Sequence, residues 1–178
     1  MLDFRDSVTG LGGRELLEEF LLFHVALARR RRTPLGLIYA DVEQLDRVNR
    51  LLGRDAGDAL LRLVVVRMRA ALRASDPLVR AGPDEFAALL PDAGDFGAIV
   101  VTEKVRRACA GWYIAQGAQQ PLRVTVGSSV FPADGDSADA LLRRAEAATY
   151  RMKVADRQIF GPLGRCTGAE YVLGPRSP

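Results

Sequence analysis

The chain contains few of the residues that carry metal or nucleophilic chemistry. Its 178 residues include one histidine and two cysteines. Cys109 and Cys166 lack the spacing of a zinc site, and His24 lies in an apolar helical pattern that predicts a partly buried helix position. We therefore expect no zinc site.

Long apolar runs are also absent. No uncharged apolar run is long enough to cross a bilayer, and the N-terminus carries acid rather than the basic start of a signal peptide. We expect no membrane span and a reduced, cytoplasmic compartment.

Charge of either sign is only slightly in excess. The formal net charge is +3, and much of it comes from the run of arginines at positions 29–32. These arginines lie at the end of a predicted helix, where cations complement the helix dipole, and no aromatic residues alternate with them. We therefore expect a solvated helix end and no nucleic-acid partner.

The apolar residues, 48% of the chain, suffice for one full core. We expect one domain over residues 1–160 and a tail over 161–178, which is rich in Gly and Pro and lacks periodicity. The patterns predict helices, strands and a hairpin in this order: a helix to about 31, a buried strand at 35–40, a helix at 42–52, a turn and N-cap region at 53–58, a helix at 59–74, a hairpin at 77–80 and 85–90, a helix at 98–110, a strand at 122–131 and a helix at 137–155. This order fits the α/β (α+β) class, with a β-α-β-β-α-β ferredoxin-like core and a central, mostly antiparallel sheet flanked by helices.

The most informative stretch is the turn Gly82-Pro83-Asp84-Glu85-Phe86, which places two adjacent carboxylates between apolar strands. Asp41 ends the predicted buried strand, and adjacent central strands would bring it beside Asp84. Two carboxylates with phosphate oxygens suit Mg²⁺, a hard cation that prefers oxygen ligands. The structural alternative is that Asp41 caps the following helix and Asp84 only forms the turn.

Two further pairs could complete a nucleotide site. Lys153 and Arg157 are four residues apart on the last predicted helix and could share a face toward phosphates, or form a solvated helix end. Asn49 and Asp58 bracket a glycine-containing loop, and an amide with a carboxylate can bind the edge of guanine. Capping of the long helix by Asp58 is the plainer alternative, and it is compatible with guanine binding.

Over about residues 6–158, the chain resembles the GGDEF domains of diguanylate cyclases, which have a nucleotide-cyclase-like core. The resemblance is carried by Asp6 to Leu11, Asp41-Val42-Glu43 followed by Asn49, Gly57 to Leu61, Gly82 to Phe86, and Ala145 to Arg157. In that family two subunits each bind GTP, and the two substrates condense into cyclic di-GMP.

The resemblance implies a role for each candidate. Asp41 and Asp84 would be ligands of Mg²⁺ if GTP binds, and Asp84 would help to deprotonate the attacking 3′-hydroxyl, with Glu85 as a neighbouring catalytic acid. Asn49 and Asp58 would hold guanine, while Lys153 and Arg157 would hold the β- and γ-phosphates. The chemistry would be in-line phosphoryl transfer, in which positioning and charge neutralisation lower the barrier.

The chain departs from the family pattern in the signature turn and near the phosphates. Pro83 replaces the second glycine, which gives a degenerate GPDEF signature and removes a backbone N–H. Asp46 stands where the family usually has Lys, and Leu45 replaces a Phe. Because a positive contact near the phosphates becomes negative, these changes predict impaired catalysis rather than a changed fold.

One further motif resembles the family's inhibitory site. Arg73-Ala74-Ser75-Asp76 precedes the signature turn at the family's spacing, and Lys104 or Arg106 on the next helix could add a cationic contact to cyclic di-GMP. The plainer alternative is an ion pair between Arg73 and Asp76 at a helix end.

Three hypotheses for function follow. The leading one is a bacterial-type signalling domain with an impaired active site that binds cyclic di-GMP through Arg73 and Asp76. The second is an active, product-inhibited diguanylate cyclase, and the third is a GTP-binding regulatory or dimerisation module. Each leaves open a homodimer and a fused or paired sensor or effector domain.

Overall fold

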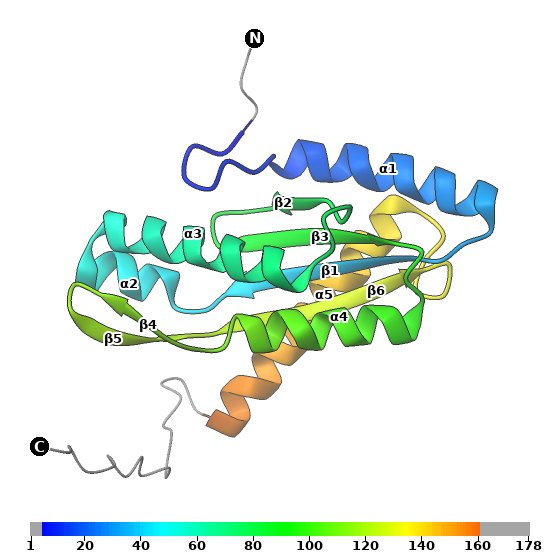
Figure 1. Ribbon diagram of the computed structural model, residues 1–178. Helices are drawn as coiled ribbons and strands as arrows, with labels where there is room; N and C mark the ends of the chain where they lie inside the picture. Colours follow the sequence, from blue (N-terminus) through cyan, green and yellow to red (C-terminus); the bar gives the residue numbers. More distant parts are fainter. Residues whose placement is uncertain (1–4, 161–178) are drawn as a thin grey trace, which may run out of the picture.

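The structure is a computed structural model that describes residues 5–160, with side chains except those at positions 118, 157, 159 and 160. The predicted tail at 161–178, with Cys166, lies outside the described residues. The described elements, shown in Figure 1, are α1 (Arg14–Arg31), β1 (Leu35–Val42), α2 (Leu45–Leu52), α3 (Arg54–Ala71), β2 (Leu78–Arg80), β3 (Glu85–Pro91), α4 (Asp95–Ala108), β4 (Gly111–Ala115), β5 (Ala118–Leu122), β6 (Val124–Phe131) and α5 (Ala138–Phe160).

The central sheet has the strand order β2-β3-β1-β6, and all of its neighbouring strands are antiparallel. Helices α2 and α3 together connect β1 to β2, and α4 lies on the route from β3 to β6 (Figure 1). The central antiparallel sheet and the β-α-β-β-α-β order are therefore confirmed.

Strand β1 is buried on both faces because helices cover each side of the sheet. Ile38 and Ala40 point into the core formed with α2, α3 and α4, whereas Leu37 and Tyr39 point into the core formed with α1 and α5. Alternate residues of a strand face opposite sides, so burial of both faces requires a continuous apolar run. Asp41 is the first acidic residue after that run, and the strand therefore delivers it to the rim of the sheet.

One strand prediction is wrong in part. The predicted strand at 122–131 is interrupted at Arg123, so that β5 ends at Leu122 and β6 begins at Val124. The β4–β5 hairpin was missed altogether. Its Ala115 pairs with Ala118 around a loop whose two residues, Gln116 and Gly117, have φ of 50° and 77°. A two-residue loop with both φ positive is a preferred hairpin turn, and Gly117 was the available signal.

The two capping roles that the sequence offered as plainer alternatives, for Asp41 and Asp58, are also wrong. Strand β1 continues to Val42, so Asp41 lies within the strand, and α2 begins only at Leu45 after Gln44. Helix α3 begins at Arg54, which places Asp58 inside the helix rather than at its N-cap. Ser137 does cap α5, because its Oγ accepts a hydrogen bond from the backbone N–H of Ala140 at 3.2 Å.

Candidate functional site

The β2–β3 hairpin carries the signature turn to the end of β1. Arg80 pairs with Phe86, and the backbone N–H groups of Ala81 and Gly82 donate to the carbonyl of Glu85 at 2.8 and 3.2 Å. On the other side, the N–H of Val42 donates to the carbonyl of Asp84 at 2.8 Å. The predicted hairpin is thus confirmed, and its acidic turn is hydrogen-bonded directly to the strand that carries Asp41.

The acidic side chains form a cluster with a lysine from α5. Asp41 lies opposite Glu85 in the β1–β3 register, and Asp84 precedes Glu85. Lys153 Nζ donates to both carboxylate oxygens of Asp41 at 2.7 Å, and the Asp41 side chain is 14% exposed. Residues more than a hundred positions apart in sequence therefore meet at one end of the sheet.

Burial and like charge raise the pKa values of two of these acids. Burial raises the pKa of Asp84, the charge of Asp41 raises it further, and Lys153 opposes the shift. Burial also raises the pKa of Glu85, whereas a hydrogen bond from the Tyr39 hydroxyl lowers this pKa in part. The cluster therefore holds more negative charge than Lys153 balances, and a bound cation would relieve it.

Asp46 adds to this excess. Its carboxylate is among the charges that raise the pKa of Asp84. Asp46 therefore acts electrostatically on the acidic turn.

Asn49 and Asp58 lie on the neighbouring helices α2 and α3. A Cβ added at Gly57 would be only 1.8 Å from Asn49 Oδ1, so the Asn49 side chain lies directly against this glycine. The absence of a side chain at position 57 makes this close approach possible. The amide of Asn49 is thereby placed beside the residue that precedes Asp58.

Of the two basic residues predicted on the last helix, only one has a described side chain. Lys153 lies at the acidic cluster, as described above. Arg157 lies in α5, one turn further along, and its side chain is outside the described part of the chain.

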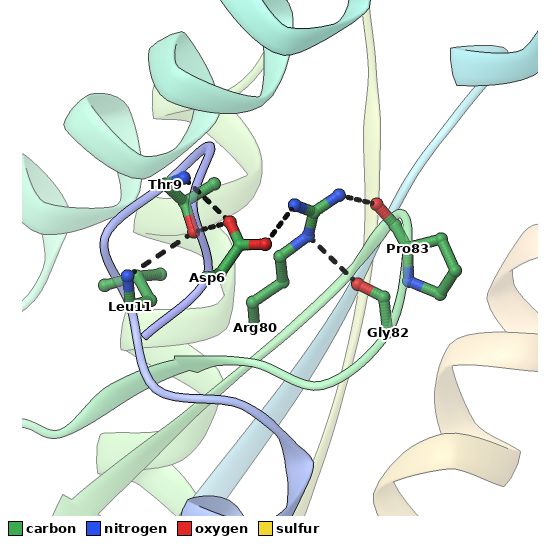
Figure 2. Close-up of polar contacts among 6 residues, drawn as sticks. All are labelled: Asp6, Thr9, Leu11, Arg80, Gly82 and Pro83. Carbon is green, nitrogen blue, oxygen red and sulfur yellow. Dashed lines mark hydrogen bonds and ion pairs between the residues drawn. The ribbon is translucent and has the colours of Figure 1, made fainter. Parts of the chain in front are cut away.

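Arg80 is a residue of this site that the sequence did not single out. Its guanidinium donates to Asp6 Oδ2 at 2.8 Å, to the carbonyl of Gly82 at 3.2 Å, and to the carbonyl of Pro83 (Figure 2). Asp6 also accepts hydrogen bonds from the backbone N–H and the hydroxyl of Thr9 at 2.7 and 2.5 Å. Arg80 therefore joins the N-terminal loop to the signature turn. A lone basic residue at the end of an apolar strand was the only available signal.

The Arg73 to Asp76 segment forms a turn after α3. The backbone N–H of Arg73 donates to Asp76 Oδ2 at 2.9 Å, and Asp76 is only 3% exposed. Arg69 also donates to the carbonyl of Asp76 at 3.0 Å. The plainer alternative, an ion pair between Arg73 and Asp76, is therefore wrong, because the Asp76 carboxylate accepts from the main chain of Arg73, whose side chain is exposed.

Lys104 and Arg106 lie on α4, which packs against α3. Lys104 is exposed, whereas Arg106 is held by Glu103 through hydrogen bonds of 2.8 and 3.1 Å. Lys104 is therefore the better placed of the two to contact a ligand.

Within residues 5–160, no group of three or more His, Cys, Asp or Glu side chains is arranged to hold a metal ion. Asp41 and Asp84 supply two carboxylates, so a cation there would need oxygen ligands from a bound phosphate as well.

None of the helices in the described part of the chain is long and apolar enough to cross a membrane.

Comparison with known proteins agrees with this geometry. A family profile described as "Diguanylate cyclase, GGDEF domain" matches residues 3–158. The chain belongs to the GGDEF domain family, whose members occur in cyclic di-GMP signalling proteins.

Similar proteins include a cyclic di-GMP phosphodiesterase, NbdA, and a diguanylate cyclase, TpbB, both of Pseudomonas aeruginosa. Each is 32% identical to this chain. The match with NbdA covers 85% of this chain, and the match with TpbB covers 88% of it. The solved GGDEF domain of TpbB is 31% identical, with a TM-score of 0.79, and the match covers 86% of this chain and 89% of that one. The chain spans 19% of NbdA and 36% of TpbB, so both relatives are much longer proteins.

Proposed function

We propose that this chain is a GGDEF domain that binds GTP with Mg²⁺ at the acidic turn and converts it to cyclic di-GMP only slowly. The observation that supports it best is the placement of Asp41, Asp84 and Lys153 around one point at the sheet end. Asn49 and Asp58 on the adjoining helices would bind guanine, and Lys153 with Arg157 would bind the outer phosphates.

Mg²⁺ fits the cluster because the carboxylates are close enough to repel one another and are short of positive charge. Asp41 and Asp84 would hold the ion, which would neutralise triphosphate charge. Asp84 would also accept the proton of the 3′-hydroxyl. Glu85 lies beside it, and the Tyr39 hydroxyl holds its carboxylate by a hydrogen bond.

Slow turnover is proposed because of Asp46 and Pro83. Asp46 places a negative charge where the triphosphate would lie, which disfavours phosphate binding at short range. Pro83 offers no N–H to a nucleotide, although its carbonyl is held by Arg80 and the hairpin keeps its register. In this proposal the site would keep its fold and lose two contacts to phosphate.

GTP binding can be tested by thermal unfolding with GTP and Mg²⁺. GTP at about 100 times its Kd should stabilise the protein by about 2.7 kcal/mol. Asp58→Ala should abolish the shift, and Asp55→Ala, which removes an exposed carboxylate from the same helix, should retain it. No shift with GTP, or equal shifts in both variants, would contradict the proposed site.

Turnover can be tested by chromatography of GTP incubated with Mg²⁺ and the protein at high concentration. Asp46→Lys should raise the rate of cyclic di-GMP formation by about tenfold, which corresponds to about 1.4 kcal/mol of transition-state stabilisation. Asp46→Asn, which only removes the charge, should give a smaller increase. Unchanged rates in both variants would show that Asp46 does not limit turnover.

A second candidate function is cyclic di-GMP binding at the turn after α3. It is favoured by the exposed Arg73, whose guanidinium has no hydrogen bond or ion pair to the described residues, and by Lys104 on the adjacent helix. Asp76 would then hold the turn in shape. Calorimetry with cyclic di-GMP should show binding that Arg73→Ala weakens by about tenfold and Arg62→Ala, an exposed arginine on α3, leaves intact. Binding that is absent, or unaffected by Arg73→Ala, would reject this function.

A further inference from the structure

A cavity lies between α2 and the β4–β5 hairpin, outside the acidic turn. Its volume is about 580 Å³, and none of its lining residues belongs to the proposed GTP or cyclic di-GMP sites. This volume lies within the range of about 300–1,000 Å³ that is usual for small-molecule sites. The cavity is therefore large enough for a ligand of its own.

The two walls of this cavity are fixed to one another. Gln116, at the tip of the hairpin, donates from Nε2 to the carbonyl of Leu52 at the end of α2, at 2.6 Å. Arg67 of α3 donates to the carbonyls of Ala110 and Trp112 at 3.1 and 3.3 Å. Because both ends of the hairpin are tied to helices, the cavity is preformed rather than a gap that side chains would close.

The lining combines one aromatic ring, two guanidinium groups and two carboxamides. Trp112 and Leu51 line the cavity and are 57% and 62% exposed, so their apolar surfaces have little cover from the described chain. Arg47 and Arg123 also line it, as do Gln44 and Gln120, and Arg47 donates to Gln44 at 3.2 Å. No Asp or Glu is among the lining residues.

Each of these groups recognises a different part of a ligand. An exposed indole stacks against planar rings, and guanidinium groups bind phosphate or carboxylate. Carboxamides both donate and accept hydrogen bonds, so they suit the polar edge of a heterocycle. We infer that this cavity binds a planar aromatic anion of about the size of a nucleoside monophosphate, with its ring on Trp112 and its anionic group at Arg47.

The cavity offers an optical test because Trp112 is the single tryptophan of the chain. Tryptophan emission therefore reports on this cavity directly, whereas the proposed GTP site contains no indole. Titration with AMP, with excitation beyond the adenine absorption band, should change the emission saturably. Adenosine, which lacks the anion, and inorganic phosphate, which lacks the ring, should each bind at least about tenfold more weakly, since each loses one of the two contacts.

Variants locate the binding. Arg47→Ala should weaken AMP binding by about fivefold or more, whereas Arg50→Ala, an exposed arginine on the same helix outside the cavity, should leave it unchanged. Calorimetry on Trp112→Ala should show the loss of binding without relying on emission, and a melting curve should confirm that this variant is folded.

Three results would overturn the inference. The first is the absence of a saturable response to AMP in the unmodified chain. The second is equal affinity in Arg47→Ala and Arg50→Ala. The third is loss of the response in Asp58→Ala, which would place AMP in the guanine site instead. The inference does not depend on GTP turnover, so failure of the proposed function would leave it standing.

Discussion

The two hairpins of this chain are held by arginines in different ways. In β2–β3, Arg80 belongs to the hairpin itself and binds the carbonyls of its own turn, and β3 also pairs with β1. In β4–β5, Arg67 comes from α3 and binds carbonyls at the start of the hairpin, which has no third strand in the described structure. A two-stranded hairpin is marginal by itself, so β4–β5 should depend on its side-chain contacts far more than β2–β3 does.

The largest effect should follow from Arg67→Ala. Its guanidinium donates to three backbone carbonyls, those of Ala108, Ala110 and Trp112. Loss of these hydrogen bonds to a charged group should lower the free energy of unfolding by about 2 kcal/mol and shift the emission of Trp112. Urea unfolding measures the first effect and fluorescence the second.

The control for this variant is Arg62→Ala, an exposed arginine on the same helix, which should change stability by less than about 0.5 kcal/mol. A loss of similar size in both variants would mean that β4–β5 is not held by Arg67.

Asp6→Asn tests the link between the N-terminal loop and the acidic turn. Burial alone would raise the pKa of Asp6, but the hydrogen bonds from Thr9 and Arg80 outweigh it and lower the pKa. When folding lowers the pKa of an acid, ionisation of that acid stabilises the folded state at pH values above the unfolded pKa. This stabilisation is lost as the pH falls through the folded pKa. The variant should therefore cost about 1 kcal/mol at neutral pH.

The cost should shrink as the pH falls below about 4, where Asp6 becomes protonated in the unfolded chain, and it should vanish once the pH has passed the lower pKa of folded Asp6. Urea unfolding of both proteins across this range measures the difference. A cost that is the same at every pH would show that the charge of Asp6 contributes nothing and that only its shape matters.

Asp84→Asn should have a smaller effect of opposite sign. Folding raises the pKa of Asp84, so its ionised form destabilises the fold at neutral pH, and this cost disappears below the unfolded pKa. Because solvent screens this partly exposed group, the variant without nucleotide should be more stable by only about 0.5 kcal/mol at neutral pH. It should also lose the Mg²⁺-dependent part of the GTP shift. A destabilised variant would mean that the Asp84 carboxylate holds the turn rather than serving a ligand.

The sequence predicted the elements whose apolar residues form a clear pattern along the chain. The apolar run at 35–40 predicted β1, and the apolar strands around Gly82 to Phe86 predicted β2–β3, because burial on both faces leaves an unbroken pattern. The β4–β5 hairpin was missed because its strands are largely exposed and carry Gln119, Gln120 and Pro121, which give no alternation.

The same contrast separates the site residues. Asp41, Asp84 and Lys153 could be proposed as site residues from the sequence because acids at a strand end and a turn, with a base on a helix, are local signals. Arg80 and Trp112 could not be proposed in this way, since the contact of Arg80 with Asp6 and the place of Trp112 in the cavity wall arise only in the folded chain. Asp58 was expected near a helix start because Gly53 and Gly57, two glycines close together, are typical of a turn. In the structure, Gly57 lies within α3.

The effect of Pro83→Gly on stability should be no larger than that of Asp84→Asn, and it distinguishes the fold of the β2–β3 turn from its chemistry. Arg80 binds the carbonyl of Pro83, a contact that glycine also provides, and Pro83 is exposed. Stability should fall by only about 0.5 kcal/mol, because glycine gives the unfolded chain more freedom. GTP affinity, measured by calorimetry, should rise if the added N–H reaches the nucleotide. A loss well above 1 kcal/mol would instead show that the proline, rather than Arg80, fixes the turn, and that the two hairpins differ less than their arginines suggest.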